Sequence, residues 1–230
     1  MFARYEQTHP EVISESLDIS ARRLVAVSGP CIALEVACKV PTTVVCASID
    51  HESAEILQCL LMSPTFRVYT SDDPIGVQLG GGLKNITAIA AGICDGLGFG
   101  TNTKSALITR GLAEIIRLGV RLGAQPDTFT GLSGMGDLIT TCFSPHSRNR
   151  HVGEEIGRGR SLKDILSEMV MVVEGIRTTK AAHHLSLKLG FEMPITEQVY
   201  RVLFEGKNPK DAVGDLMERE RKSEREVYSE

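Results

Sequence analysis

The hydrophobic pattern of this chain changes near residue 72, and that change restricts the folds that it can adopt. Three short runs rich in β-branched and aromatic residues come before it: LVAVS at 24–28, TTVVCAS at 42–48 and FRVYT at 66–70. Helices are expected between them, over 32–38 and 51–62. Because strands that alternate with helices are typical of α/β sheets, we expect an incomplete parallel sheet over 1–72.

From residue 73 onward the pattern becomes helical. The stretch 74–93 is apolar on most sides, yet it carries Gly76, Gly80, Gly81, Gly82 and Gly92. Each glycine costs a helix up to about 1 kcal/mol relative to alanine, so their number indicates close approach of a neighbouring backbone or a ligand. Further helices are predicted over 102–122, from Pro126 to a break at GLSGMGD (131–137), and over 150–158, 162–169, 175–189, 195–204 and 211–217. The part from 73 to 230 is therefore expected to be an all-α domain.

Composition excludes some classes of partner. The 230 residues are 42% hydrophobic and 23% charged, which is ordinary for a globular chain. A net charge of −4, an aromatic content of 5% and the lack of tryptophan argue against a nucleic-acid partner.

The sequence also indicates the cellular compartment of the protein. No apolar run approaches the roughly 18–20 residues that span a bilayer. The opening MFARYEQTHPEV lacks the apolar stretch of a signal peptide. The six cysteines form neither a CxxC pair nor a zinc-type spacing. We therefore expect a cytoplasmic protein with free thiols, no membrane span and no metal.

Glycine-rich fragments occur at three places, GLGFG at 96–100, SGMGDL at 133–138 and GRGR at 157–160. None has the third glycine of a G-x-G-x-x-G fingerprint, and none links a predicted strand to a helix. We interpret these fragments as turns or helix breaks, and the sequence contains no Walker loop.

Two polar features in the helical part are candidates for chemistry. Lys84 lies inside the apolar stretch GGGLKNITAIAAGI, where burial would lower its pKa and make the amine a usable proton donor. The alternative is a lysine that reaches from a buried helix to the surface. SPHSRNRH at 144–151 precedes a helix that Ser147 could cap, so its amides and Arg148 could bind an anion. The alternative is a surface turn with incidental basic residues.

Two further candidates lie beside predicted turns. Asp137 in GMGD is either a turn or cap residue, or it orients a polar substrate near a lysine and an arginine. SGP at 28–30 follows the first strand, and ligands of open α/β sheets collect beyond the carboxyl ends of strands. The alternative for SGP is a turn that simply ends the strand.

Together these segments closely resemble the bacterial NAD(P)-dependent glycerol-3-phosphate dehydrogenase family. The resemblance begins near residue 24, covers almost all of the chain after it, and keeps the motifs in the family's order. It rests on SGPCIALEVA (28–37), GVQLGGGLKNITAIAAGICDGLGFGTNTKSALITRGLAEIIRLG (76–119), GLSGMGDLITTC (131–142), SRNRHVG (147–153), VVEGIRTTKA (172–181) and EMPITEQVYRVLFEGK (192–207). It implies a Rossmann-type NAD(P)-binding remnant over 1–72 and a helical substrate domain, similar to the C-terminal domain of 6-phosphogluconate dehydrogenase, over 73–230.

The resemblance also implies an activity and a set of site residues. The family reversibly reduces dihydroxyacetone phosphate to sn-glycerol 3-phosphate, a precursor of glycerophospholipids, by hydride transfer from NADH or NADPH. Lys84 matches the catalytic lysine, which protonates the carbonyl oxygen. Positions that match substrate contacts are Gly29, Cys31, Lys84, Asp137, Ser147, Arg148 and Asn149. Positions that match cofactor contacts are Ala33, Arg148, Val172 and Glu174.

The chain departs from the family pattern in three respects. Cys31 stands where the family usually has serine or threonine, and a thiol is a weaker hydrogen-bond partner. Gly82 replaces a usual alanine, which should loosen the helix slightly. The family's G-x-G-x-x-G unit and a second substrate lysine would precede residue 1, in a segment on the order of 60–100 residues long. We therefore expect this truncated chain, by itself, to bind NAD(P)H poorly and to turn over negligibly.

Two other interpretations remain open at this point. The chain could be a non-catalytic helical remnant that serves self-association or partner binding, since its helices are mostly apolar and a homodimer is compatible with them. It could also belong to a different dehydrogenase with the same helical domain, although the SRN turn, which suits a phosphate, disfavours that.

Overall fold

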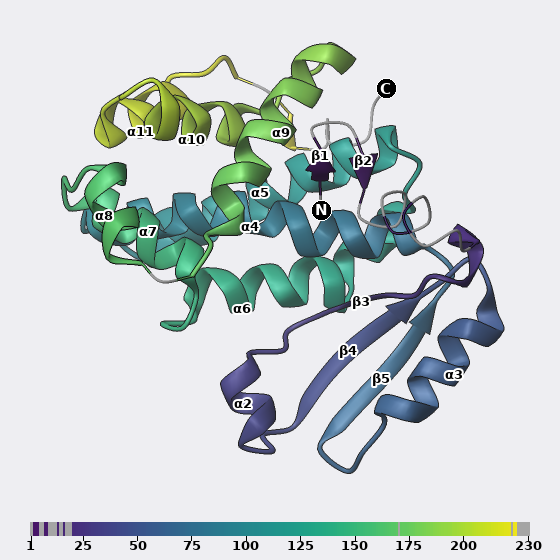
Figure 1. Ribbon diagram of the computed structural model, residues 1–230. Coiled ribbons are helices and arrows are strands. Elements are labelled where there is room, and N and C mark those ends of the chain that lie inside the picture. The colour runs from purple at the N-terminus through teal and green to yellow at the C-terminus, as the bar shows by residue number, and fades with distance from the viewer. Residues whose placement is uncertain are drawn as a thin grey trace. The chain divides into compact units, whose positions relative to one another are not determined.

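The structure is a computed structural model that describes residues 2–4, 7–8, 13, 16, 20–169, 171–221 and 223–224. The chain forms two compact units, whose elements are labelled in Figure 1. The first unit comprises Met1–Gly82 and Gly119–Thr140, and the second comprises Leu83–Leu118 and Thr141–Glu230.

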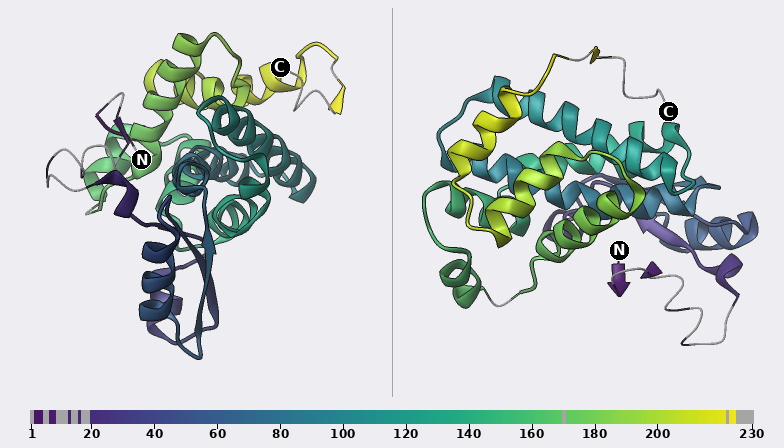
Figure 2. Two further views of the ribbon diagram at one scale, coloured as in Figure 1. Left: turned by 90° about the vertical axis from the view of Figure 1, so that its right-hand side faces the viewer. Right: turned by 90° about the horizontal axis from the view of Figure 1, so that it is seen from above.

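A three-stranded sheet organises the first unit, in the order β3 (Ala26–Ser28), β4 (Thr42–Ala47) and β5 (Phe66–Ser71). β4 and β5 are parallel, with Thr42 opposite Phe66 and Ala47 opposite Ser71. Helix α3 (His51–Leu61) connects them and lies along one face of the sheet (Figure 2, left). The predicted α/β class, with a small Rossmann-type sheet, is confirmed.

β3 departs from the parallel direction that the sequence pattern predicts. It pairs with β4 in antiparallel register, with Ala26 opposite Ala47 and Ser28 opposite Val45. A parallel pair needs a crossover, usually a helix packed on a sheet face. The connecting helix α2 (Ala33–Ala37) has five residues and none is buried, so the chain turns back instead of crossing. The sheet is therefore mixed, with an antiparallel edge strand.

Successive side chains of β4 lie on opposite faces of the sheet, as a strand requires. One face carries a buried cluster of Val44, Cys46 and Val68, against which Leu57 of α3 packs. The other carries Val45, Ala47 and Val77. Val77 belongs to the first turns of α4 (Pro74–Gly96), so the sheet is covered on both faces within this unit.

Asp73 fixes the start of α4. Its buried carboxylate accepts hydrogen bonds from the Gly76 amide at 2.8 Å, the Gln125 amide at 2.9 Å and the Thr128 hydroxyl at 2.7 Å. Thr128 lies in the 3₁₀ helix η2 (Pro126–Thr130), which Pro126 begins as predicted. One aspartate therefore caps α4 and connects it to η2.

The prediction that the segment GLSGMGD breaks the helix is wrong. Leu132–Gly136 forms a π-helical turn, η3, that leads into α6 (Asp137–Phe143), a helix that the sequence analysis missed. A Cβ atom at Gly134 would lie 2.0 Å from the carbonyl oxygen of Phe129. This glycine therefore permits close packing of the turn against η2 rather than helix termination.

The second unit is built from helices, and α4 and α7 pack backbone to backbone within it. Besides parts of α4 and α6 it contains most of α5 (Thr101–Arg121), and α7 (Arg148–Gly157), α8 (Leu162–Glu168), α9 (Glu174–Leu189), α10 (Pro194–Phe204) and α11 (Pro209–Met217). A Cβ atom at Gly92 would lie 1.9 Å from the Arg150 carbonyl oxygen, and one at Gly153 would lie 2.0 Å from that of Ile89. The close approach predicted from the glycines of α4 is confirmed at Gly92.

The remaining described elements are short. β1 (Phe2–Arg4) and β2 (Gln7–Thr8) form an antiparallel pair, and the 3₁₀ helix η1 (Ala21–Arg23) precedes β3. Within the described part of the chain, every helix is too short or too polar to cross a membrane.

Candidate functional site

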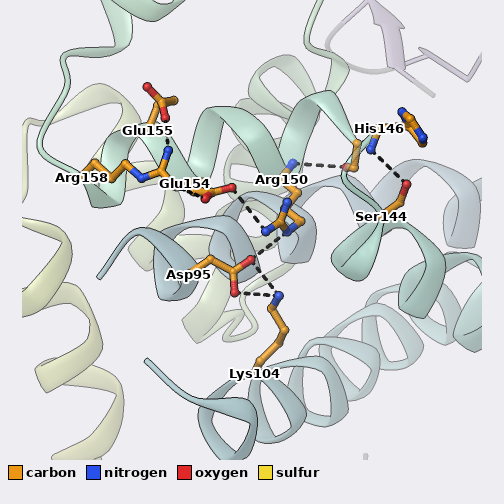
Figure 3. Close-up of polar contacts among 9 residues, drawn as sticks. Asp95, Lys104, Ser144, His146, Arg150, Glu154, Glu155 and Arg158 are labelled. Carbon is orange, nitrogen blue, oxygen red and sulfur yellow. Dashed lines mark hydrogen bonds and ion pairs between the residues drawn. The ribbon is translucent and has the colours of Figure 1, made fainter. Parts of the chain in front are cut away.

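The turn before α7 has the structure of a capped helix start, as predicted for Ser147. The Ser147 hydroxyl accepts a hydrogen bond from the Arg150 amide at 3.2 Å. Upstream, the Ser144 hydroxyl accepts a hydrogen bond from the His146 amide at 3.1 Å (Figure 3). Other first-turn amides of a helix have no partner within the helix, so they can bind an anion next to the Arg148 side chain.

Asn149 connects this turn to two other helices. Its buried amide nitrogen donates to the Asn85 side-chain oxygen in α4 at 3.0 Å. Its side-chain oxygen accepts from the Gly175 amide in α9 at 2.9 Å. A Cβ atom at Gly175 would lie 2.5 Å from that oxygen, so only glycine fits there without a shift. Asn149 therefore fixes the first turn of α7 against α4 and α9.

This network brings the segments of Lys84 and Arg148 together within the second unit. Lys84 precedes Asn85 in α4, and Arg148 precedes Asn149 in α7, so the Asn85–Asn149 hydrogen bond joins residues directly adjacent to both cations. Lys84 is half-buried, whereas Asn85 beside it is buried. The cationic candidates of α4 and α7 thus lie on contacting segments.

The pKa of the Cys142 thiol is affected by charges in the same region. Burial raises the pKa of this thiol to about 12, while Lys104, Lys84 and Arg150 act in the opposite direction through their positive charges. Lys84 and Arg150 therefore act on one buried group although they come from different helices. A thiol with so high a pKa stays protonated and unreactive at neutral pH.

Arg148 also holds the segment that precedes α9. Its Nη1 atom donates to the Val172 carbonyl oxygen at 2.7 Å. Val172 is 61% exposed, and Glu174, the first residue of α9, is exposed as well. Arg148 and Val172, two of the residues that the resemblance assigns to cofactor contacts, are therefore in contact, and Glu174, a third, follows two positions after Val172.

The remaining predicted residues belong to the first unit. Gly29 has a φ of 141°, and a Cβ atom there would lie 3.0 Å from the Val44 Cα atom, so the turn after β3 requires glycine. The Ser28 hydroxyl donates to the buried Asp137 carboxylate at 3.5 Å, a long hydrogen bond. Asp137 therefore lies near the SGP turn. Cys31 and Ala33, which follow that turn, are both exposed.

Sequence reasoning gave no role to Asn85, although an asparagine inside an apolar helix was a usable signal. In the described ranges there is no group of three or more histidine, cysteine, aspartate or glutamate side chains that could hold a metal ion.

The fold and the candidate residues define a structural class: a small α/β sheet of the Rossmann type joined to a helical C-terminal part. A family model described as NAD-dependent glycerol-3-phosphate dehydrogenase C-terminus matches residues 73–214. The model of the N-terminus of the same enzyme matches residues 3–54. The chain therefore belongs to the NAD-dependent glycerol-3-phosphate dehydrogenase family, and the resemblance carried by its motifs is confirmed.

Individual relatives agree with this assignment. A glycerol-3-phosphate dehydrogenase (NAD(P)+) of Oceanobacillus iheyensis is 56% identical over 214 residues, which make up 93% of this chain and 62% of that protein. The enzyme of the same name from Pelotomaculum thermopropionicum is 57% identical over 217 residues, again 62% of its length. The crystal structure of a glycerol-3-phosphate dehydrogenase from Coxiella burnetii matches with a TM-score of 0.83 and 45% identity, covering 85% of this chain and 60% of that one. This chain thus spans less than two thirds of the length of these relatives.

Proposed function

We propose that this chain is the substrate-side portion of an NAD(P)-dependent glycerol-3-phosphate dehydrogenase, which interconverts dihydroxyacetone phosphate and sn-glycerol 3-phosphate. The observation that carries the proposal is the buried contact of Asn149 with Asn85 and Gly175, because it holds Lys84 and Arg148 on contacting segments. A phosphorylated three-carbon substrate needs this pairing, with a cation for its phosphate and a proton donor for its carbonyl oxygen.

The first turn of α7 is the proposed phosphate site. Ser147, Arg148 and Asn149 supply a capped helix start and a guanidinium, and this combination suits a phosphate because N–H donors and a positive charge both favour an anion. Gly29, Cys31 and Asp137 are proposed to contact the substrate as well. Asp137 would accept a hydrogen bond from a substrate hydroxyl. Its hydrogen bond with Ser28 at the SGP turn supports the proposal that Asp137 and the turn contact the same substrate.

Lys84 is the proposed catalytic residue. As an ammonium group it would protonate the carbonyl oxygen of dihydroxyacetone phosphate, and as an amine it would remove the proton from the hydroxyl of glycerol 3-phosphate. Its positive charge would also stabilise the alkoxide that develops on that oxygen. Lys84 is half-buried and lies between Leu83 and Asn85 within α4.

The residues present fit one end of a nicotinamide cofactor. Met171 and Val172 are exposed, and the Arg148 guanidinium donates to the Val172 carbonyl oxygen, so this segment offers apolar surface for a flat ring and a cation for an anionic group. We propose that Ala33, Arg148, Val172 and Glu174 hold NAD or NADP, which supplies the hydride when bound. The printed sequence contains no G-x-G-x-x-G turn for the pyrophosphate, so we propose that this chain alone binds the cofactor weakly.

Assembly and compartment are also proposed. Five cysteines, Cys38, Cys46, Cys59, Cys94 and Cys142, carry free thiols, which supports a reducing compartment such as the cytoplasm. Exposed apolar side chains on the second unit, including Leu187 and Met217, support self-association, and we propose a homodimer. Sedimentation of the purified chain tests this, and a monomer at all concentrations would contradict it.

Calorimetric titration of the purified chain tests the proposed function. Glycerol 3-phosphate should bind, and glycerol should not, because the phosphate supplies most of the recognition. Arg148→Gln should abolish binding, whereas Arg110→Gln, which removes an exposed arginine of α5, should leave it unchanged. Equal binding of glycerol, or binding that survives Arg148→Gln, would favour a non-catalytic helical module instead. Family-like dehydrogenase rates from the chain alone would contradict the proposed weak cofactor binding.

A further inference from the structure

One carboxylate joins three helices next to the proposed phosphate site. Asp95, near the end of α4, accepts hydrogen bonds from the Lys104 ammonium of α5 at 2.7 Å and from the Arg150 Nε atom of α7 at 2.7 Å (Figure 3). The exposed fractions of these side chains are 19% for Asp95, 10% for Lys104 and 18% for Arg150. The three charges are therefore largely shielded from water. Because of this shielding, solvent weakens their ion pairs less than it weakens exposed ones.

Arg150 is held at its other atoms as well. Its Nη2 atom lies 3.3 Å from the Glu154 carboxylate, and its amide donates to the Ser147 cap. Its carbonyl oxygen occupies the space that a side chain at Gly92 would fill. Side chain and backbone of Arg150 are thus both fixed to the neighbouring helices.

The first turn of α7 is consequently secured at two successive residues. Asn149 binds Asn85 of α4 and Gly175 of α9, and Arg150 binds Asp95 near the end of α4. Arg148 directly precedes these two anchors in the sequence. A ligand site of this kind gains affinity when its residues are already in place before the ligand arrives, because less ordering is needed on binding.

The charge of Asp95 has a second consequence. Arg150 directs its Nε atom to the carboxylate, so its guanidinium is engaged inside the protein rather than offered to an anion. The ion pair therefore leaves Arg148 as the arginine of the SRNR sequence that is available to the phosphate. The hydrogen bond described for the Arg148 guanidinium joins its Nη1 atom to the Val172 carbonyl oxygen, not to a carboxylate.

We propose that Asp95 is a positioning residue for the anion-binding turn at 147–149, and that it acts through Arg150 without touching the substrate. The inference rests on the proposed function, since it assigns a role to the substrate turn. It predicts that the carboxylate of Asp95, and not merely its volume, is needed for full affinity.

The test is a titration of the full chain with glycerol 3-phosphate, followed by calorimetry and by NMR. Asp95→Asn should weaken binding about tenfold, by analogy with the lower end of the range seen when a group that orients a metal ligand is lost. Asp95→Asn in an Arg150→Gln background should add little, because the first change acts through the arginine. Glu197→Gln, which breaks the Arg201–Glu197 pair on α10, is the matched control and should leave the affinity unchanged.

The NMR signals separate positioning from general stability. In the wild-type chain the Arg150 Nε–H proton should exchange slowly with water, and Asp95→Asn should abolish that protection and shift the amide signals of 147–149 even without ligand. If Asp95→Asn fails to fold, Asp95→Glu keeps the carboxylate and should restore the protected Nε–H signal.

Two results would overturn the proposal: unchanged or tighter binding by Asp95→Asn, or additive effects of the two substitutions. If the wild-type chain does not bind glycerol 3-phosphate, the proposed function fails. The Nε–H and amide signals then still decide whether Asp95 positions the turn.

Discussion

Replacing Glu114 with glutamine should change the pH dependence of stability in a defined direction. Glu114 is 4% exposed in α5, and its carboxylate caps the start of α10. It accepts hydrogen bonds from the Ile195 amide at 2.6 Å, the Thr196 amide at 3.2 Å and the Thr196 hydroxyl at 3.1 Å. Burial raises the pKa of Glu114 to about 7, and the hydrogen bonds from Ile195 and Thr196 oppose that rise only in part.

The magnitude follows from the protonation of the two states. The folded pKa of about 7 exceeds the ordinary value of 4.5, so the folded state binds the proton more tightly than the unfolded chain. The resulting stabilisation is complete below pH 4.5 and is lost as the pH rises through 7. Between pH 5 and pH 8 the loss amounts to about 2–3 kcal/mol, because each pKa unit corresponds to about 1.4 kcal/mol.

Glutamine removes the titration and also one acceptor oxygen. An amide NH₂ group that faces the N–H donors of α10 leaves a buried donor unsatisfied, which costs about 1–3 kcal/mol. At pH 5 the wild-type chain should therefore be the more stable by about that amount. By pH 8 its advantage should have fallen by about 2–3 kcal/mol, because only the wild type titrates.

Urea denaturation followed by circular dichroism, from pH 5 to pH 8, measures both effects. Glu197→Gln is the control, since it removes a carboxylate from a partly exposed ion pair worth at most about 1 kcal/mol. A stability difference between Glu114→Gln and wild type that stays constant, or grows, as the pH rises would refute the reasoning.

Three other substitutions, two of them with a matched control, test the helix packing, the Ser147 cap and the hydrogen bonds of Asn149. Gly92→Ala should destabilise the chain by about 1–3 kcal/mol or more in urea denaturation, because its Cβ atom would lie 1.9 Å from a carbonyl oxygen of α7. Gly214→Ala in α11, where nothing lies within 4 Å, should instead stabilise it by about 0.5–1 kcal/mol, and equal effects would contradict the packing argument. Ser147→Ala should cost about 1 kcal/mol and also weaken glycerol 3-phosphate binding in calorimetry. Ser161→Ala removes a similar cap from α8 and should cost stability alone, so a loss of binding there would contradict the assignment. Asn149→Asp should weaken binding in the same titration, since a carboxylate cannot donate to Asn85, and unchanged binding would argue against that network.

Much of the helical architecture could be predicted from periodicity and caps. The helix expected over 175–189 is observed at Glu174–Leu189, and the one expected over 162–169 is observed at Leu162–Glu168. Glycine-rich segments were harder to interpret. GLSGMGD contains residues that disfavour helices, yet close packing against Phe129 holds it in a π-helical turn. Local propensity carries no information about such a contact.

The candidate site also contains residues that a local sequence pattern can reveal and contacts that it cannot. Lys84 stands out because a charged residue inside an apolar helix is unusual, and the SRN turn stands out because basic residues precede a helix that Ser147 can cap. The pairing of Asn85 with Asn149 joins positions 64 residues apart, and no local pattern could reveal it. The direction of β3 was missed for a related reason, since the alternation of strands and helices does not state how long a crossover helix must be.

The most direct test of the account is an NMR titration of the full chain with glycerol 3-phosphate, in which the Lys84 ammonium and the Arg148 guanidinium are observed together. Both signals should shift along one saturation curve with a single dissociation constant. A shift confined to one of the two cations, or two curves with different midpoints, would contradict the claim that they serve one site.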